Sequence, residues 1–183
     1  MALFASPSKN GWSSMLHGAF LDGMGGVSIT RIHVYDLAIQ PCNACGDCKN
    51  DFTCPLKDDM RMLYDHINAC DCMSISTPLY FSAPPSPLKA LMDRCQPFWE
   101  RRRREERMPA KKKSFLIGVG GGEYPDMFQP LVRIMRHYFS SCGFRFDENE
   151  WLLVNGSDKK RIDGTILQTA REAGRLFSRK LGE

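Results

Sequence analysis

Four cysteines lie close together in the first third of the chain, with the spacing C-x2-C-x2-C-x5-C and a proline directly after the last. They are Cys42, Cys45, Cys48 and Cys54. Two-residue gaps allow successive sulfurs to surround one centre, and ferredoxin cysteine runs end in Cys-Pro in the same way. Structural zinc sites more often use two separated C-x2-C pairs. The motif therefore favours an iron–sulfur cluster, while zinc, or reduced thiols without a metal, are the alternatives.

A hydroxyl-rich loop lies near the start of the chain. The sequence SPSKNGWSS connects a short apolar stretch at residues 3–5 to a helical pattern that begins at Trp12. Backbone N–H groups at a helix N-terminus, together with the helix dipole, favour a phosphate. Five side chains could add hydrogen bonds: Ser6, Ser8, Asn10, Ser13 and Ser14. A plain helix-cap loop accounts for the same residues, so both interpretations remain open at this point.

Two further loops follow apolar stretches that are expected to be strands. TPLYFSAPPSP, which combines prolines with two aromatic residues, follows the stretch at 72–77. Gly120, Gly121 and Gly122 follow the stretch at 114–119. Glycines after a strand allow a flat group to lie against the backbone, and a flexible turn is the alternative.

These loops are connected by apolar patterns that alternate between strand and helix spacing. Strands are expected at 3–5, 28–34, 72–77, 114–119 and, as one or two short strands, within 144–154. Helices are expected from Trp12 to the glycines at 23, 25 and 26, and at 58–70, 86–95, 128–142 and 162–177. The alternation predicts an α/β protein with a doubly wound, five-stranded parallel sheet, helices on both faces and the flavodoxin-like order 2-1-3-4-5. Its ligand site is expected where the loops after the first, third and fourth strands meet, with the cysteine loop on the same rim.

The composition is that of one soluble globular domain spanning residues 1–183, with a cysteine-rich loop at 41–57. A net charge of +4 is too small to indicate nucleic acid, and no apolar run approaches the roughly 20 residues that cross a membrane. The start of the chain lacks the basic and apolar regions of a signal peptide. Eight cysteines without such a signal indicate thiols in a reducing compartment, so we expect a cytoplasmic protein.

One strongly basic run, RRRREERMPAKKK, occupies residues 101–113. A solvated helix end and loop is the simpler interpretation. The alternative is a landing patch for an acidic electron-transfer partner such as a ferredoxin, or for a cofactor phosphate.

Three stretches in chain order resemble the NAD(P)H-dependent FMN reductase family. SPSKNGWS resembles its phosphate loop, TPLYFSAPPSPLKALMDR its proline–aromatic stretch that ends in Asp-Arg, and GVGGGE its glycine loop. PCNACGDCKNDFTCPLKDDM is similar to the compact cysteine motif of the iron–sulfur flavoproteins in that group. Together the stretches extend over nearly the whole chain. Their occurrence in this order is a more specific sign of the family than any one stretch alone.

The resemblance implies a flavodoxin-like homo-oligomer, a dimer or a tetramer, that holds FMN and accepts electrons from NAD(P)H. It implies that the FMN phosphate is bound by Ser6, Ser8, Asn10 and Ser13. It implies that the flavin is lined by Pro78, Leu79, Tyr80 and Phe81, with Gly120 to Gly122 on another edge. It also implies a 4Fe–4S cluster on Cys42, Cys45, Cys48 and Cys54. Ser8 stands where the family usually has arginine, which predicts weaker FMN binding than in relatives.

The leading hypothesis is an electron-transfer flavoprotein in which FMN and a 4Fe–4S cluster convert between two-electron and one-electron carriers. The second is a cluster-free NAD(P)H-dependent FMN or quinone reductase whose cysteines bind zinc or nothing. The third is a flavin-less binding or regulatory module. No Ser-His-Asp or Cys-His arrangement supports hydrolysis, the histidines are interpreted as structural or surface residues, and no catalytic side chain is assigned because the flavin carries the chemistry.

Overall fold

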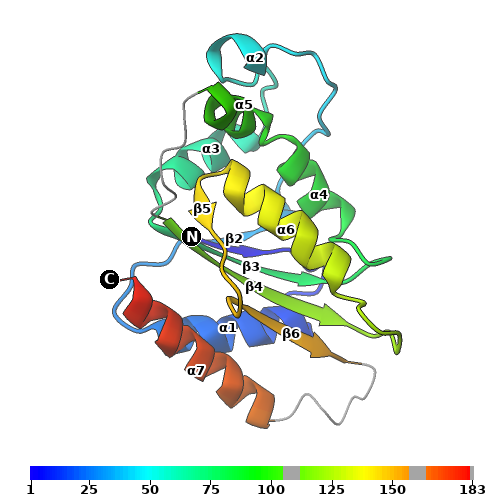
Figure 1. Cartoon of the computed structure of the whole chain (residues 1–183), viewed down its shortest axis with the longest axis vertical. Helices are drawn as coiled ribbons and strands as arrows, with labels where there is room; N and C mark the ends of the chain where they lie inside the picture. Colours follow the sequence, from blue (N-terminus) through cyan, green and yellow to red (C-terminus); the bar gives the residue numbers. More distant parts are fainter. Residues whose placement is uncertain (105–111, 157–163, 182–183) are drawn as a thin grey trace.

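Parallel strands form a twisted sheet between two helical layers in the computed structural model, which describes residues 1–104, 112–156 and 164–181 (Figure 1). The strands are β1 (Ala2–Phe4), β2 (Arg31–His33), β3 (Cys72–Pro78), β4 (Lys112–Gly120), β5 (Phe144–Arg145) and β6 (Trp151–Asn155). The helices are α1 (Trp12–Met24), α2 (Cys48–Asp51), α3 (Met60–Ala69), α4 (Ser86–Asp93), α5 (Gln96–Arg104), α6 (Gln129–Ser141) and α7 (Gly164–Lys180), and a 3-10 turn, η1, covers Val34–Asp36.

The strand order is β2-β1-β3-β4-β5, and every pair of strands is parallel. This confirms the predicted flavodoxin-like order. The fifth position is shared by two short strands, because β5 pairs with the start of β4 at Lys112 and Lys113 while β6 pairs with its second half from Leu116 to Gly120.

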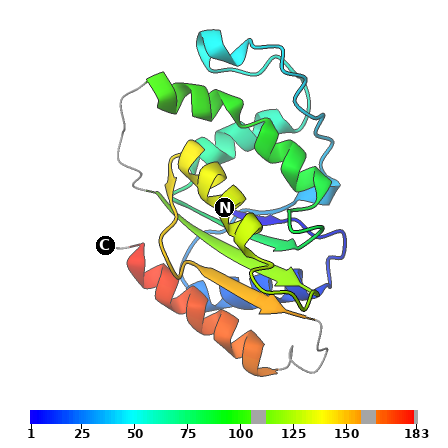
Figure 2. The same cartoon turned by 45° about the vertical axis from the view of Figure 1, so that its right-hand side comes forward.

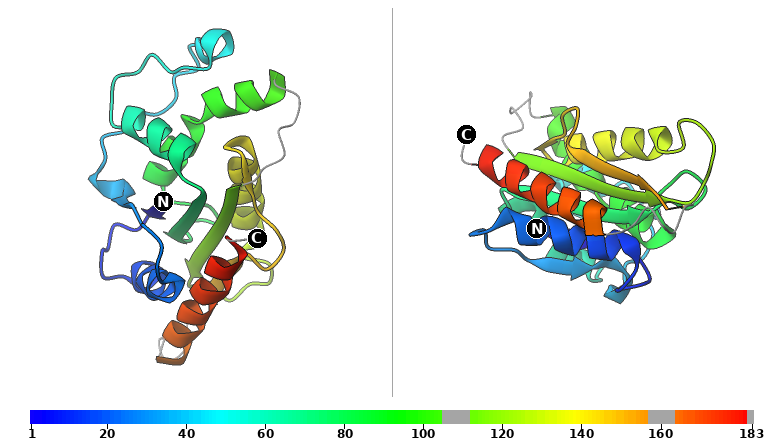
Figure 3. Two further views of the ribbon diagram at one scale, coloured as in Figure 1. Left: turned by 90° about the vertical axis from the view of Figure 1, so that its left-hand side faces the viewer. Right: turned by 90° about the horizontal axis from the view of Figure 1, so that it is seen from below.

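Helices cover both faces of the sheet, as predicted. α1 and α7 lie side by side on one face, while α3, α4 and α6 lie on the other (Figures 1 and 3). Neighbouring residues of a strand therefore enter different cores. Leu3 and Leu116 pack with the α3–α4–α6 layer, whereas Phe4 and Phe115 pack against α1 and α7. Burial on both faces explains why these strands read as continuous apolar runs.

The contact between α1 and α7 depends on two glycines. A Cβ placed on Gly23 would lie 1.9 Å from the carbonyl oxygen of Arg171, and one on Gly174 would lie 1.9 Å from that of Phe20. Gly23 was expected to end the first helix, but it lies within α1, and its role is this close approach. The helix ends at Gly25 and Gly26, whose positive φ angles of 44° and 68° favour glycine.

The carboxyl ends of β3, β4 and β6 point to the same side of the molecule (Figure 1). The loops that follow β1, β3 and β4 gather there, as predicted. The loop after β2 takes a different course, because it rises past α4 and carries α2 to a position beside α5 (Figures 1 and 2). The cysteine loop therefore begins near the rim, but its helical part lies away from it, contrary to expectation. No helix in the described ranges is long and apolar enough to span a membrane.

His17 of α1 is the most deeply buried histidine of the described chain. Its Nδ1 lies 2.9 Å from Ser76 Oγ, its Nε2 lies 2.8 Å from Ser74 Oγ, and its ring packs against Phe4 at 4.2 Å between centroids. Burial, assisted by the positive charge of Arg31, lowers the pKa of His17 from 6.5 to about 3. The neutral ring thus joins α1 to β3, which confirms a structural role.

The lowered pKa of His17 leads us to expect that the protein loses stability in acid. Between pH 6.5 and about 3 the unfolded chain binds a proton at His17 that the folded chain does not, so the free energy of unfolding falls with decreasing pH. The contribution is at most about 1.4 kcal/mol per pH unit. His17→Gln should show a correspondingly flatter decline between pH 7 and pH 5 in urea unfolding. Parallel pH profiles for the two proteins would contradict the assignment.

Candidate functional site

The amino end of α1 is open for an anion. Gly11 occupies the cap position, no described side chain caps the helix, and its first turn carries no acidic residue. The N–H groups of a first helical turn have no partner within the helix, so they face the rim with the positive end of the helix dipole. Lys9 beside them is held by Asp36, with Nζ 2.6 Å from Oδ2. This geometry fits a phosphate.

The predicted phosphate-binding side chains divide into two groups. Ser6, Ser13 and Ser14 are buried, whereas Ser8 and Asn10 are exposed. Ser6 Oγ accepts the N–H of Ser8 at 3.2 Å, and Ser14 Oγ donates to the carbonyl of Ser8 at 3.0 Å. Two of the hydroxyls thus shape the loop itself, so the backbone of α1 is better placed than these side chains to bind an anion.

The loop after β3 presents an aromatic residue in a strained conformation. Tyr80 and Ala83 exchange backbone hydrogen bonds of 2.9 and 3.0 Å, which forces Phe81 and Ser82 to positive φ angles of 49° and 63°. The Phe81 side chain is fully exposed. Ser82 Oγ lies 2.7 Å from the hydroxyl of Tyr124 in the loop after β4, so the two loops are joined across the rim. Strain concentrated at an exposed aromatic residue is typical of a ligand-binding loop.

The three glycines at the end of β4, Gly120 to Gly122, do not share one role. A Cβ on Gly120 would lie 2.8 Å from Met127 Cε and 3.1 Å from Leu79 Cδ2, and one on Gly122 would lie 2.6 Å from the ring of Tyr124. Around Gly121 no described atom lies within 4 Å of such a Cβ. Gly121 therefore offers open space to a flat ligand, while its two neighbours serve the packing of the loop.

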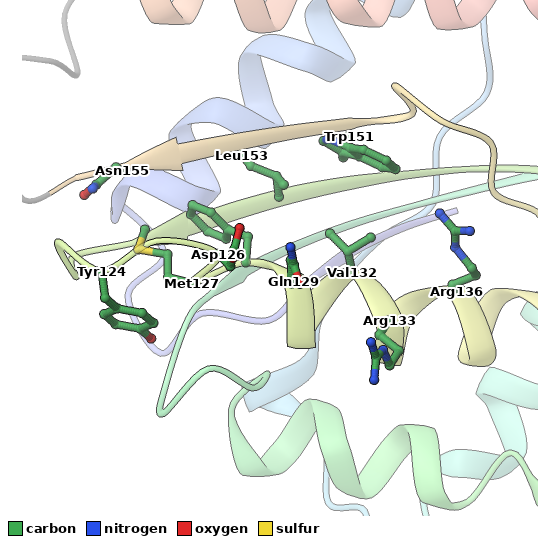
Figure 4. Close-up of a pocket in the computed structure, with 11 residues that line it drawn as sticks. Tyr124, Asp126, Met127, Gln129, Val132, Arg133, Arg136, Trp151, Leu153 and Asn155 are labelled. Atoms are coloured by element: carbon green, nitrogen blue, oxygen red, sulfur yellow. The ribbon is translucent and has the colours of Figure 1, made fainter.

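Sequence reasoning missed a cavity of about 700 Å³ on the far side of this loop. It lies between α6 and β6, where Arg133 and Arg136 flank an apolar surface that includes Val132, Trp151 and Leu153 (Figure 4). The helical spacing of α6 predicted its buried face correctly. It gave no sign that β6 would be an edge strand that leaves part of this face uncovered.

All four motif cysteines line a second cavity, of about 370 Å³. Its other wall is the junction of α4 and α5, from Asp93 to Glu100. Cys42 and Cys45 are exposed, and Cys48 and Cys54 are half-buried. Burial, assisted by the charge of Glu100, raises the pKa of the Cys48 thiol. Four cysteine sulfurs around one cavity are a donor set that fits a thiolate-bound metal centre, although no three potential ligands in the described residues are close enough to form a metal site.

The cysteine loop bends through left-handed backbone positions. Ala44, Gly46 and Phe52 have positive φ angles of 56°, 88° and 61°. Nothing lies within 4 Å of a Cβ on Gly46, so glycine is favoured there by backbone conformation and not by crowding. Phe52 ends α2, and Asp51 Oδ1 accepts the N–H of Thr53 at 3.0 Å.

A buried ion pair closes the base of this loop. The guanidinium of Arg94, only 1% exposed, binds both carboxylate oxygens of Asp58 at 2.7 and 3.2 Å. Arg94 also donates to the carbonyl of Gln40 at 2.8 Å, and the N–H of Gln40 donates to Asp58 at 2.9 Å. Residues 40 and 58 flank the loop, so these contacts hold its two ends together. We call the contacts among Gln40, Asp58 and Arg94 the Arg94 clasp. Asp58 also lies one residue before the cap position of α3, and its Oδ1 accepts the N–H of Met60 at 3.1 Å.

Unpaired carboxylates around the motif would repel thiolates there, and a bound metal would relieve that repulsion. The structure weakens that argument, because most of these carboxylates are already engaged. Asp58 pairs with Arg94, Asp51 caps Thr53, and Asp59 Oδ2 accepts the N–H of Ala38 at 2.7 Å. The support for a metal centre thus comes from the shared cavity of the cysteines.

The remaining four cysteines lie outside this cavity. Cys72, Cys95 and Cys142 are buried, and Cys70 is half-buried. Cys95 Sγ donates to the carbonyl of Leu91 and Cys70 Sγ to that of Ile67. None of them lines the cavity of the motif cysteines.

The described part of the basic run covers the cysteine loop. Arg101 and Arg104 of α5 lie over the ring of Phe52, with Cζ 5.7 and 5.3 Å from its centroid. Arg103 pairs with the buried carboxylate of Glu100 at 2.8 Å. Residues 105–111 of the run lie outside the described residues. A cluster of cations therefore stands next to the cysteine cavity.

Comparison with known proteins identifies a family and several relatives of this chain. The model of the family described as NADPH-dependent FMN reductase matches residues 1–129, which include the rim loops and the cysteine loop. A protein named iron-sulfur flavoprotein from Methanosarcina thermophila is 32% identical over 49% of this chain and 48% of its own length. One from Methanocaldococcus jannaschii is 28% identical over 53% of this chain and 51% of its own. The matches thus span about half the length of these curated relatives.

Solved structures share the fold at low identity. A flavone reductase aligns with all of this chain and 62% of its own, with a TM-score of 0.71 and 16% identity. An azoreductase from Bacillus anthracis aligns over 98% of both chains, with a TM-score of 0.67 and 15% identity. A WrbA-like flavodoxin from Agrobacterium tumefaciens covers 99% of this chain and 95% of its own, with a TM-score of 0.63 and 12% identity.

Gly120 and Gly121 have different surroundings, and this difference allows a test of whether the loops at the carboxyl ends of the strands bind a flavin. Gly121→Ala should leave the free energy of unfolding nearly unchanged, because its Cβ meets nothing, but should weaken FMN binding about tenfold. Gly120→Ala, the matched control, should destabilise the protein by about 1 kcal/mol through overpacking against Met127 and Leu79. Urea unfolding and fluorescence titration with FMN measure the two effects. An unchanged FMN affinity in Gly121→Ala would remove the rim assignment.

Proposed function

Since the chain belongs to the NADPH-dependent FMN reductase family, we propose that it is an FMN-dependent electron-transfer flavoprotein with a 4Fe–4S cluster in the cysteine cavity. The observation that carries the cluster is that Cys42, Cys45, Cys48 and Cys54 line one cavity while the other cysteines do not. The names of the archaeal relatives support the same combination of groups.

The residues around the rim suit FMN. The open amino end of α1 binds the phosphate, with Ser6 and Ser14 holding the loop in shape around it. Gly121 leaves space for the ring, and the joined loops after β3 and β4 bring Tyr80 and Phe81 to its edge. A single phosphate loop without a G-x-G-x-x-G pattern favours FMN over FAD.

FMN supplies two-electron chemistry that can be released in single steps, and an iron–sulfur cluster accepts electrons singly. The chain's own contribution is to hold and separate the two groups. The cysteines come from the loop after β2, whereas the flavin loops come from β1, β3 and β4. The exposure of Cys42 and Cys45 leaves the cysteine side of the molecule accessible to a protein partner.

A cluster-free NAD(P)H-dependent FMN or quinone reductase fits the family equally well. The observation in its favour is that the motif thiols, although they line one cavity, are not gathered into a metal site in the described structure. Cofactor analysis separates the two candidates.

Cysteine variants test the cluster. Cys48→Ser should lose iron and acid-labile sulfide but retain FMN, because the flavin loops come from other strands. Cys70→Ser is the matched control, since its half-buried thiol lies outside the cavity, and it should retain both groups. Iron, sulfide and flavin are measured after anaerobic purification. Bound zinc in the wild type would rule out the cluster, and full iron content in Cys48→Ser would overturn the assignment of Cys48 as a ligand.

We further propose an acidic one-electron carrier as partner, on the cationic surface beside the cysteines. Arg101→Gln/Arg104→Gln should slow electron transfer with a ferredoxin-type carrier about tenfold at low salt and flatten its dependence on ionic strength. Arg133→Gln/Arg136→Gln, which removes the same charge from the cavity between α6 and β6, is the control. Stopped-flow absorbance at equal iron content measures the rates. Equal slowing by both double variants would exclude a docking role for α5.

A further inference from the structure

The side chain of Arg94 is almost completely withdrawn from water, and yet it is charged. A buried guanidinium needs partners for all of its N–H groups, because each unpaired one costs solvation energy. The two terminal nitrogens are satisfied by Asp58 and by the carbonyl of Gln40. The third nitrogen, Nε, is buried and has no hydrogen-bond acceptor among the described residues.

Cys54 is the candidate acceptor. Cys54 and Arg94 line the same cavity. A neutral thiol is a weak acceptor, whereas a thiolate bound to a metal accepts N–H hydrogen bonds readily.

We propose that Arg94 is a positioning residue of the cysteine site, whose free Nε–H donates to the sulfur of Cys54 when that sulfur is a metal-bound thiolate. The proposal rests on the function proposed above. Arg94 thereby has two tasks. Its terminal nitrogens close the loop through the Arg94 clasp, and its Nε and positive charge act on the bound centre.

The expected consequence is electrostatic. A cation and an N–H donor beside a ligand sulfur stabilise the more negative, reduced state of an iron–sulfur centre, so they raise its reduction potential. The exposed arginines of α5 are screened by solvent. Arg94 is screened far less, because only 1% of it is exposed.

A purely structural role of Arg94 makes a different prediction. Arg94→Gln and Asp58→Asn both break the same ion pair, so loosening of the loop alone would shift the midpoint potential of both variants in the same direction. The proposed role lowers the potential in Arg94→Gln, which loses the cation and the Nε donor. It does not lower the potential in Asp58→Asn, which loses an anion and keeps Arg94.

The experiment is a redox titration of wild-type and variant proteins, reconstituted anaerobically with iron and sulfide and compared at equal iron content per chain. Arg94→Lys is the third variant, because it keeps the charge without Nε, and its potential tests the proposal if Arg94→Gln does not fold. The expected order of potentials is wild type, then Arg94→Lys, then Arg94→Gln, with Asp58→Asn at or above wild type.

Equal lowering in Arg94→Gln and Asp58→Asn would overturn the proposal, as would an unchanged potential in Arg94→Lys and Arg94→Gln. Wild-type protein that takes up no iron and sulfide would instead refute the cluster, and the role of Arg94 with it. Iron uptake with unchanged potentials refutes the role of Arg94 alone.

Discussion

The ion pair between Asp58 and Arg94 is the constraint on which the cysteine side of the molecule depends. It joins the segment before the loop, the start of α3 and the end of α4, and the hydroxyl of Tyr64 adds a 2.7 Å hydrogen bond to the carbonyl of Arg94. Removal of one partner from a buried ion pair costs about 3–5 kcal/mol, because a charge is left uncompensated. The cysteines between Gln40 and Asp58 form no regular core of their own, so their position follows from this closure.

The two candidate sites are built in different ways. The rim site is built on backbone ends, from the first turn of α1 and the loops after β3 and β4, so its geometry is fixed by the sheet itself. The cysteine cavity is built on side chains and rests on α4 and α5, outside the strand ends. One sheet thus holds a site that depends on strand order and another that depends on a single long-range contact.

Sequence reasoning predicted most of the fold because the relevant signals are local. Apolar runs such as that of β4 and the helical spacing of α6 gave the elements, and the alternation of strands and helices gave the layers. The clasp could not be predicted, because Asp58 and Arg94 are distant in sequence and each has an ordinary local interpretation. For the same reason local patterns predict a helix end at Gly23, where this glycine in fact serves the contact with α7.

Because the Arg94 clasp closes the base of the cysteine loop, the length of this loop has little effect on the stability of the sheet. Once Gln40 and Asp58 are held together, a longer or shorter segment between them changes chiefly its own chain entropy, and a doubling of loop length costs only about 0.6 kcal/mol. Insertions and deletions between residues 41 and 57 are therefore tolerable without any change in the sheet. The spacing of the cysteines in this segment can therefore change while the flavodoxin-like fold stays the same.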